Sequence, residues 1–351
     1  MLETLVPPAL PGTAAVTTVV TETVQRSRLE WTGGKRLMVV AGRTHPRLAA
    51  DICDHLGLVP GHVTCKNFAN GETYVRYEES VRGVDVFIVQ PTFGDVNGSL
   101  MELLLLIDAA RQGSAHRITA VMPWFGYSRQ DKKSAPREPI SARLVADMLQ
   151  VAGADRVITM DLHAGQIQGF FRIPVDHMTA MPVLVNFFND QGDSKDDLVI
   201  VSPDAGRAKL AERYRDRLGC DVAILTKERN AHHAARITNV LGEVAGKRCV
   251  LLDDMIDTGG TLLAGAQALK AEGATHVSAA ATHGLFSADA YERIERSQLD
   301  QVIVTDSVPP RGDRPSKIVV LSVAQLLSDT IRNVFSDESV SEIFEGDNQL
   351  F

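Results

Sequence analysis

Carboxylates, hydroxyls and glycines are concentrated in one twelve-residue stretch, 250–261, with the sequence VLLDDMIDTGGT. The apolar residues at its start predict a buried parallel strand, and the apolar residues that follow it predict a helix. The loop between them joins a strand's carboxyl end to a helix's amino end, where free backbone N–H groups and the helix dipole favour a phosphate. Gly259 and Gly260 allow the backbone to approach such a ligand closely.

The acids of this stretch indicate which phosphorylated ligand it suits. The sequence contains neither a G-x-x-x-x-G-K-[ST] triphosphate loop nor a G-x-G-x-x-G dinucleotide loop. Asp253, Asp254 and Asp257 would repel a bare polyphosphate, but carboxylates accept hydrogen bonds from vicinal hydroxyls and hold Mg²⁺. We therefore predict a sugar monophosphate site. An acidic strand-to-helix turn capped by Thr258 would explain a lone Asp-Thr-Gly, but not the whole string.

A second loop, at residues 123–133, combines aromatic and basic side chains in the sequence PWFGYSRQDKK. Flat rings beside the Arg129 guanidinium and the Gln130 amide suit a purine, through stacking, cation–π contact and hydrogen bonds to the base edge. A solvated basic loop anchored by an aromatic plug fits the same composition. The residues of this loop alone do not decide between the two.

Three further groups of polar residues follow predicted strands. Asp161 and His163 share a face, where they could hold a divalent metal, or His163 could contact a phosphate; a buried structural histidine is the simpler alternative. Asp204 would ligate a metal or a hydroxyl at a strand's carboxyl end, the edge at which open α/β sheets bind ligands. Lys227 and Arg229 would clamp an anion such as a transferring phosphoryl group, unless they are exposed charges on a turn.

Alternating strands and helices are needed to position these residues. The hydrophobic pattern predicts strands at 35–40, 84–89, 118–122, 155–160, 198–201, 221–225, 249–252, 276–281, 301–305 and 317–321, and helices at 42–57, 100–111, 139–152, 181–188, 208–218, 262–270 and 324–335. This alternation predicts an α/β fold of two doubly wound domains with parallel sheets. It also suggests an internal duplication, although no close sequence repeat is visible.

Length and composition limit the classes of protein. The 351 residues leave room for two such domains. We expect a flexible extension at 1–34, an N-terminal α/β domain at 35–180, a C-terminal α/β domain at 181–336 and a tail at 337–351. A net charge of −8 argues against a nucleic-acid partner, and no apolar stretch is long enough for a membrane span. Four cysteines without a C-x-x-C motif are typical of a reduced protein, so we expect a cytoplasmic location.

From residue 35 to about residue 344 the chain resembles the ribose-phosphate diphosphokinases (phosphoribosyl pyrophosphate synthetases) of the phosphate-activated bacterial and animal type. The matching strings are FANGE at 68–72, SRQDKK at 128–133, PISA at 139–142, DLH at 161–163, QIQGFF at 166–171, SPDAG at 202–206, KER at 227–229 and DDMIDTGGT at 253–261. Their order and joint presence are far more specific than any one of them. The fold that this resemblance implies is a pair of phosphoribosyltransferase-type domains.

The resemblance also implies a reaction and a role for each string. The family transfers the β,γ-diphosphoryl group of ATP to the 1-hydroxyl of ribose 5-phosphate and releases AMP. It needs Mg²⁺, is commonly activated by free phosphate, and usually assembles as a homohexamer whose active sites borrow residues from a neighbour through the 68–72 region. The implied roles are ATP binding for Asn70, Gly71, Glu72, Arg129 and Gln130, Mg²⁺ binding for His163 and Asp204, charge stabilisation by Lys227 and Arg229, and ribose 5-phosphate binding for Arg229, Asp253, Asp257, Thr258, Gly259, Gly260 and Thr261.

Two other functions share the 250–261 string. A phosphoribosyltransferase would consume the product of this reaction, but it would lack the Arg129–Gln130 loop and is usually a shorter, single domain. A non-catalytic regulatory subunit or ligand-sensing repressor on the same fold would typically lose the catalytic strings, which are present here. A repressor would also need a basic DNA-binding region, which the charge balance disfavours.

Overall fold

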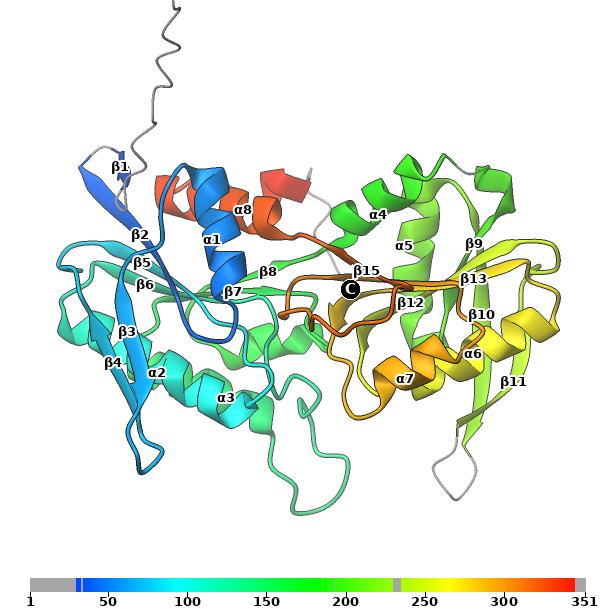
Figure 1. The fold of residues 1–351 in the computed structure, drawn as a ribbon, viewed down its shortest axis with the longest axis horizontal. Helices are drawn as coiled ribbons and strands as arrows, with labels where there is room; N and C mark the ends of the chain where they lie inside the picture. The colour runs from blue at the N-terminus through cyan, green and yellow to red at the C-terminus, as the bar shows by residue number, and fades with distance from the viewer. Residues whose placement is uncertain (1–29, 33, 193, 230–234, 345–351) are drawn as a thin grey trace, which may run out of the picture.

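The computed structural model describes residues 30–32, 34–192, 194–229 and 235–344. Two α/β halves lie side by side, each built around one twisted sheet (Figure 1). We call them the first half and the second half, in the order of their sheets along the chain. The predicted α/β fold with parallel sheets is confirmed, with one antiparallel edge strand added to each sheet.

The first sheet has six strands in the order β1-β2-β5-β6-β7-β8. They are β1 (Glu30–Thr32), β2 (Lys35–Ala41), β5 (Asp85–Val89), β6 (Arg117–Met122), β7 (Arg156–Met160) and β8 (Val175–Met178). Its helices are α1 (Pro46–Leu56), α2 (Val96–Gln112) and α3 (Ser141–Ala152). Strands β2 and β5–β7 are mostly buried because helices cover both faces of a parallel sheet.

The second sheet has seven strands in the order β11-β10-β9-β12-β13-β14-β15. They are β9 (Leu198–Ser202), β10 (Asp221–Arg229), β11 (Ala235–Leu241), β12 (Arg248–Ile256), β13 (His276–Gly284), β14 (Gln301–Thr305) and β15 (Ile318–Leu321). Its helices are α4 (Met181–Asp190), α5 (Ala208–Leu218), α6 (Gly260–Ala271) and α7 (Ala290–Glu295). Short 3₁₀ helices span Gly165–Phe170, Lys195–Asp197, Ala205–Arg207 and Ser341–Phe344.

A separate hairpin projects from the first half. Its strands β3 (Val63–Asn67) and β4 (Thr73–Tyr77) pair in an antiparallel register, and the Tyr77 hydroxyl donates a hydrogen bond to the carbonyl oxygen of Leu106 in α2 at 3.1 Å (Figure 1). The tip turns at Gly71, whose φ of 93° is costly for other residues. Asn70 and Gly71 thus form the turn, and it carries Glu72 away from the body of the first half.

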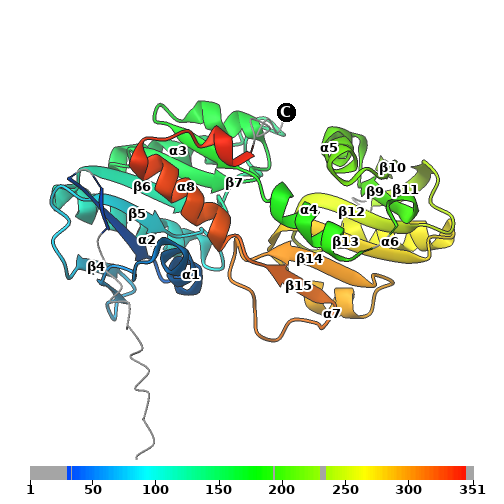
Figure 2. The same ribbon diagram turned by 90° about the horizontal axis from the view of Figure 1, so that it is seen from above.

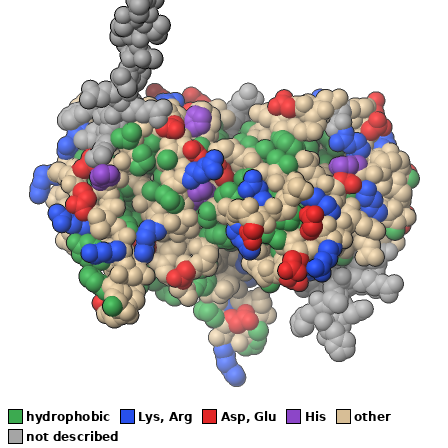
Figure 3. Space-filling model, in the orientation of Figure 1, with side chains coloured by type: hydrophobic (Ala, Val, Ile, Leu, Met, Phe, Trp, Pro, Cys, Tyr) green, Lys and Arg blue, Asp and Glu red, His purple; other side chains and the backbone are tan. Residues whose placement is uncertain are grey.

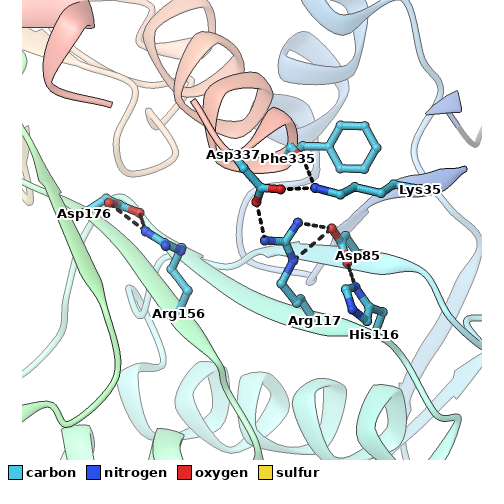
Figure 4. A network of polar contacts seen from close by, with 8 residues as sticks. All are labelled: Lys35, Asp85, His116, Arg117, Arg156, Asp176, Phe335 and Asp337. Atoms are coloured by element: carbon cyan, nitrogen blue, oxygen red, sulfur yellow. Dashed lines mark hydrogen bonds and ion pairs between the residues drawn. The ribbon is translucent and has the colours of Figure 1, made fainter. Parts of the chain in front are cut away.

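The last helix, α8 (Ala324–Ser336), returns from the second half and packs against α1 on the first sheet (Figure 2). Its apolar residues join the first core, although the sequence analysis grouped them with the 181–336 range. Polar contacts hold the end of the helix in place (Figure 4). Asp337 contacts Lys35 and pairs with Arg117 at 2.8 Å, and Arg117 in turn pairs with the buried Asp85 at 2.6 Å.

Several local expectations need correction. Residues 30–32 form strand β1, so the predicted flexible extension ends before residue 34. Strands β8 and β11, at residues 175–178 and 235–241, are absent from the predicted strands. Strand β12 also continues past Leu252 to Ile256, so Asp253 and Asp254 belong to the strand and not to the loop.

The charged side chains on the surface do not segregate by sign on the face that can be seen in Figure 3. Acidic and basic side chains are interspersed there. Among the described residues, no helix is both long and apolar enough to cross a bilayer.

Cys53, Cys65, Cys220 and Cys249 are all free thiols. Burial raises the pKa of the Cys53 thiol to about 12, so this side chain is an apolar core group and not a reactive one.

Candidate active site

A cavity of about 610 Å³ lies between the two halves. It is lined by Arg129, Asp131, Lys132, Asp161, Leu162, His163, Ala164, Gly165, Gln166, Asp204, Gly206, Arg207, Lys209, Leu210, Tyr214, Asp253, Asp254 and Thr282. These residues come from the segments after β6, β7 and β9, from helix α5 and from the ends of β12 and β13, so the cavity lies at the carboxyl edges of both sheets. That edge is where open α/β sheets bind ligands, and the volume suits a nucleotide-sized molecule.

His163, Asp254 and Arg207 form a charged cluster in the wall of this cavity. The Nδ1 atom of His163 lies 2.7 Å from Oδ2 of Asp254. Nη2 of Arg207 lies 2.7 Å from the same oxygen and 3.1 Å from His163 Nδ1. His163 comes from the first half and the other two from the second half. From the sequence, His163 was expected at a metal or a phosphate and Asp254 among the acids of the sugar site, but their contact with each other and with Arg207 was not expected.

The adjacent acids Asp253 and Asp254 have opposite electrostatic surroundings. Burial and the neighbouring carboxylate of Asp254 raise the pKa of Asp253 above its usual range. Burial alone would raise the pKa of Asp254 too, but the hydrogen bond from His163 and the charge of Arg207 outweigh burial and lower it. These surroundings therefore favour ionisation of Asp254 and disfavour ionisation of Asp253.

The Gly259–Gly260 turn adopts the predicted backbone shape. Gly259 has a φ of 73° and caps α6, which begins at Gly260, so the first N–H groups of the helix are free at this end. Arg293 of α7 donates a hydrogen bond to the carbonyl oxygen of Thr258 at 3.0 Å. Asp257 pairs with Arg129 of the first half at 2.5 Å. The predicted sugar-phosphate loop and the predicted purine loop thus meet through their own side chains.

Only part of the predicted ATP set lies at a cavity. Arg129 and Gln130 line a second space of about 300 Å³ beside the first, together with Val96, Asn97, Trp124, Tyr127 and Ser128. The Gln130 side-chain oxygen accepts a hydrogen bond from Ser141 at 2.6 Å, which fixes the start of α3 to this loop. Asn70, Gly71 and Glu72 lie instead at the tip of the β3–β4 hairpin, where Asn70 Oδ1 accepts from the backbone N–H of Glu72 at 3.2 Å. Neither cavity includes them.

The backbone of Lys227 and Arg229 lies in the outer part of β10, which pairs with β11 beyond a register shift between Thr226 and Lys227. Their side chains lie outside the described residues. Strand β10, which carries Lys227 and Arg229, lies next to β9, and the carboxyl end of β9 leads to Asp204.

The donors for a metal ion are few. Among the residues that the structure describes, no three His, Cys, Asp or Glu side chains gather into a metal site. His163 and Asp204 line the same cavity, and Oδ1 of Asp204 accepts a hydrogen bond from the N–H of Gly206 at 3.0 Å. Mg²⁺ keeps several waters and commonly binds through one or two protein carboxylates together with substrate phosphates. One carboxylate and one imidazole therefore fit a metal that arrives with a nucleotide, and not a metal held by protein alone.

A buried polar joint behind the cavity connects the two halves. Asp161 has a φ of 35°, and its Oδ2 accepts hydrogen bonds from Ala180 N–H at 2.8 Å and from the Thr282 hydroxyl at 2.6 Å. His283 is fully buried, with Nε2 3.1 Å from the carbonyl oxygen of Met160 and its ring 4.7 Å from that of Trp124. A metal held jointly by Asp161 and His163 was one of the alternatives that the sequence left open, and in the structure Oδ2 of Asp161 has Ala180 and Thr282 as its hydrogen-bond partners.

Three histidines near this joint are expected to make stability depend on pH. Burial lowers the pKa of His45, of His283 and, to about 4, of His177. Each lowered pKa means that the folded protein binds a proton at this site less readily than the unfolded chain, which protonates its histidines below about pH 6.5, so stability should fall as pH drops below that value. The loss between pH 7.5 and 5.5 should be about 1.4 kcal/mol for each histidine that stays neutral.

Urea unfolding at pH 7.5 and 5.5 measures this loss in the wild type and in His177→Gln. Other titrating groups contribute equally to both proteins, so the difference between them isolates His177. The variant should lose about 1.4 kcal/mol less than the wild type over this pH range. Equal losses in the two proteins would show that His177 is not kept neutral by the fold.

Comparison with known proteins agrees with this geometry. The model of the N-terminal domain of ribose phosphate pyrophosphokinase matches residues 37–153, and the phosphoribosyl synthetase-associated domain matches residues 231–345. The ribose-phosphate pyrophosphokinase of Corynebacterium efficiens is 50% identical over 316 residues, which cover 89% of this chain and 97% of that protein. The enzyme of the same name from Bifidobacterium longum is 49% identical over 322 residues, covering 90% of this chain and 95% of that protein.

A solved structure gives the same result for the fold. The phosphoribosylpyrophosphate synthetase of Mycobacterium smegmatis superposes with a TM-score of 0.81 at 48% identity, covering 86% of this chain and 99% of that chain. Both halves of the chain, and the joint between them, therefore have counterparts in one known architecture. On this similarity in sequence and in structure, the chain belongs to the ribose-phosphate pyrophosphokinase family.

Proposed function

We propose that this protein is a ribose-phosphate pyrophosphokinase, an enzyme that transfers the diphosphoryl group of Mg–ATP to the 1-hydroxyl of ribose 5-phosphate. The observation that carries the proposal is 50% identity across 97% of a ribose-phosphate pyrophosphokinase. The cavity supports it independently, because one wall carries acids suited to ribose hydroxyls and the other carries the basic loop suited to a nucleotide.

The proposed reaction has a simple atom balance. The oxygen of the ribose 1-hydroxyl attacks the β-phosphorus of ATP, and the bond from that phosphorus to the α,β-bridging oxygen breaks. The electron pair leaves with AMP, and the hydroxyl proton passes to solvent, so the products are 5-phosphoribosyl 1-diphosphate and AMP. Phosphoryl transfer needs little covalent chemistry from the protein, so alignment of the two substrates and neutralisation of charge supply most of the catalysis.

For the sugar, we propose that Asp253 accepts hydrogen bonds from the ribose hydroxyls. The backbone N–H groups of Thr258, Gly259, Gly260 and Thr261 would then bind the 5-phosphate. Asp257 pairs with Arg129 at 2.5 Å, so binding of the two substrates would exchange this contact for ligand contacts. Arg229 would also contact the sugar phosphate.

For the nucleotide, we propose that Arg129 and Gln130 bind the base and that His163 and Asp204 face the phosphates and their Mg²⁺. The metal would supply charge neutralisation on the phosphate oxygens. Lys227 and Arg229 would stabilise the diphosphoryl group during transfer. Asn70, Gly71 and Glu72 project on a hairpin away from the cavity of their own chain, so we propose that they complete the nucleotide site of a neighbouring copy in a homohexamer.

The remaining proposals concern the setting. We propose inorganic phosphate as an activator and the cytoplasm as the compartment, where four free thiols are chemically suited. We propose that the chain divides into two domains near residue 180. On the packing described above, α8 would then be counted with the first domain.

Product analysis tests the proposed function. The full-length protein, incubated with ribose 5-phosphate, ATP and Mg²⁺, with and without inorganic phosphate, should form AMP in step with 5-phosphoribosyl 1-diphosphate. ADP as the product would mean an ordinary sugar kinase and a wrong assignment of the nucleotide loop. Binding of both substrates without turnover would favour a regulatory subunit.

A further inference from the structure

His163 is held by a carboxylate that belongs to the other half of the molecule. Its Nδ1 lies 2.7 Å from Oδ2 of Asp254, a residue of the central strand β12. The side chain of His163 is 36% exposed, toward the cavity, while that of Asp254 is only 6% exposed. A buried carboxylate thus contacts one edge of a ring whose remainder borders the proposed nucleotide site.

The chemistry of the two groups fixes the position of one imidazole proton. An ionised carboxylate can only accept hydrogen bonds, so a contact of 2.7 Å requires the proton on Nδ1 of His163. A neutral ring then has its lone pair on Nε2, and a charged ring has its second N–H there. In both states Nε2 is the nitrogen left for a ligand in the cavity.

Arg207 reinforces this arrangement. Its Nη2 lies 2.7 Å from the same Asp254 oxygen, so two charged or polarised donors converge on one acceptor. Because Nδ1 of His163 carries a proton, its 3.1 Å approach to Arg207 is a close contact between two donors. Without the Asp254 carboxylate, Nδ1 of His163 could instead accept a hydrogen bond from Arg207, so nothing would fix the imidazole proton on Nδ1.

The neighbouring Asp253 is placed differently. Its side chain is 27% exposed, its Oδ1 accepts the backbone N–H of Asp254 at 2.9 Å, and Nε of Arg207 is 3.6 Å away. Both acids contact Arg207, but of the two only Asp254 also contacts His163. Asp253 is open to a ligand, whereas the side chain of Asp254 is already committed to His163 and Arg207.

We propose that Asp254 is a positioning residue that holds His163 with Nδ1 protonated and Nε2 directed to the phosphate and Mg²⁺ end of the bound nucleotide. The inference rests on the proposed function, which places that end of the nucleotide at His163. Metal-binding histidines commonly donate their second ring N–H to a carboxylate, and loss of such a carboxylate typically lowers metal affinity or activity by about 10- to 100-fold. Asp254 therefore acts through His163 and not by contact with the sugar.

A double-mutant cycle tests this dependence on His163. The full-length wild type, His163→Ala, Asp254→Ala and the double variant are compared for affinity toward Mg²⁺–α,β-methylene-ATP by calorimetry and for kcat. Each single variant should lose about 10- to 100-fold in affinity. The double variant should be within about threefold of His163→Ala, because Asp254 has nothing left to position.

Asp253→Asn is the matched control, since it changes the adjacent acid. In the double variant of Asp253→Asn and His163→Ala, the fold-loss in kcat should equal the product of the fold-losses of the two single variants. Asp254→Asn keeps an acceptor oxygen and should retain more nucleotide affinity than Asp254→Ala. If thermal melting shows that Asp254→Ala does not fold, the cycle is run with Asp254→Asn.

Two results would overturn the proposal. One is a double variant at least tenfold weaker than His163→Ala in nucleotide affinity. The other is an Asp254 variant that raises the KM for ribose 5-phosphate while nucleotide affinity stays unchanged, which would mean direct contact with the sugar. Failure of the proposed function is seen separately, as a wild type that forms no AMP, and the calorimetric cycle does not depend on turnover.

Discussion

Replacing Lys227 with alanine is expected to lower kcat by about 10²- to 10³-fold and to change the affinity for Mg–ATP by less than about threefold. The proposed transfer moves a highly charged diphosphoryl group between two oxygen atoms, so a cation that meets this group mainly in transit stabilises the transition state more than either bound substrate. The backbone of Lys227 lies in β10, beside the strand whose end leads to Asp204. Steady-state kinetics and calorimetry with Mg²⁺–α,β-methylene-ATP separate the two quantities.

Lys247→Ala is a suitable control for this experiment. Lys247 directly precedes β12 at the amino edge of the same sheet, and its Nζ contacts the backbone of Asp196 there, far along the strand from the acids of the proposed sugar site. Its replacement removes the same charge without touching the cavity, so kcat should stay within about twofold of the wild type. A large loss of nucleotide affinity in Lys227→Ala with nearly normal kcat would assign Lys227 to ground-state binding instead.

The alternation of strands and helices was predictable because buried parallel strands have a clear sequence pattern, a short apolar run between turn residues. What failed was the placement of elements whose local pattern is weak. Strand β8 has the sequence VDHM, in which two polar residues interrupt the apolar run, so the hydrophobic pattern predicts no strand there. Strand β11 contains Arg236, Thr238 and Asn239, and it pairs only with β10 at the edge of the sheet. The amphipathic pattern of α8 predicts a buried face, but no property of 324–336 indicates which of two sheets will cover it.

The candidate site was predictable to the extent that polar residues follow strand ends, because those ends meet at one edge of each sheet. His163, Asp204, Asp253 and Arg129 line one cavity for this reason. The contacts among them were not predictable, since His163 and Asp254 are 91 positions apart and Arg129 and Asp257 are 128 apart. Asp254 was predicted only as one of the acids of a sugar site and not as a partner of His163, and no role was predicted for Arg207 because a single arginine after a turn is usually a surface residue.

A substitution in the buried joint between the two halves is expected to cause a large loss of folding stability. His283→Ala should lower the free energy of unfolding by about 3–5 kcal/mol. The imidazole is fully buried, packs against Trp124, and has its two ring nitrogens 2.9 Å from the Ser307 hydroxyl and 3.1 Å from the Met160 carbonyl. Alanine would leave a cavity between the halves and remove the hydrogen-bond partner of a buried carbonyl, and both effects destabilise the folded state.

His276→Ala tests whether this loss belongs to the joint. His276 begins the same strand at its other end, where its side chain is 37% exposed and lies 3.4 Å from Asp300, so its removal should cost less than about 1 kcal/mol. Urea unfolding followed by fluorescence measures both variants. Because Asp161, whose backbone His283 also approaches, lies two residues before His163, the destabilised joint should also loosen the nucleotide site. An unfolding free energy for His283→Ala equal to that of His276→Ala would mean that the two halves are held together elsewhere, chiefly by α8 and its Asp337 contacts.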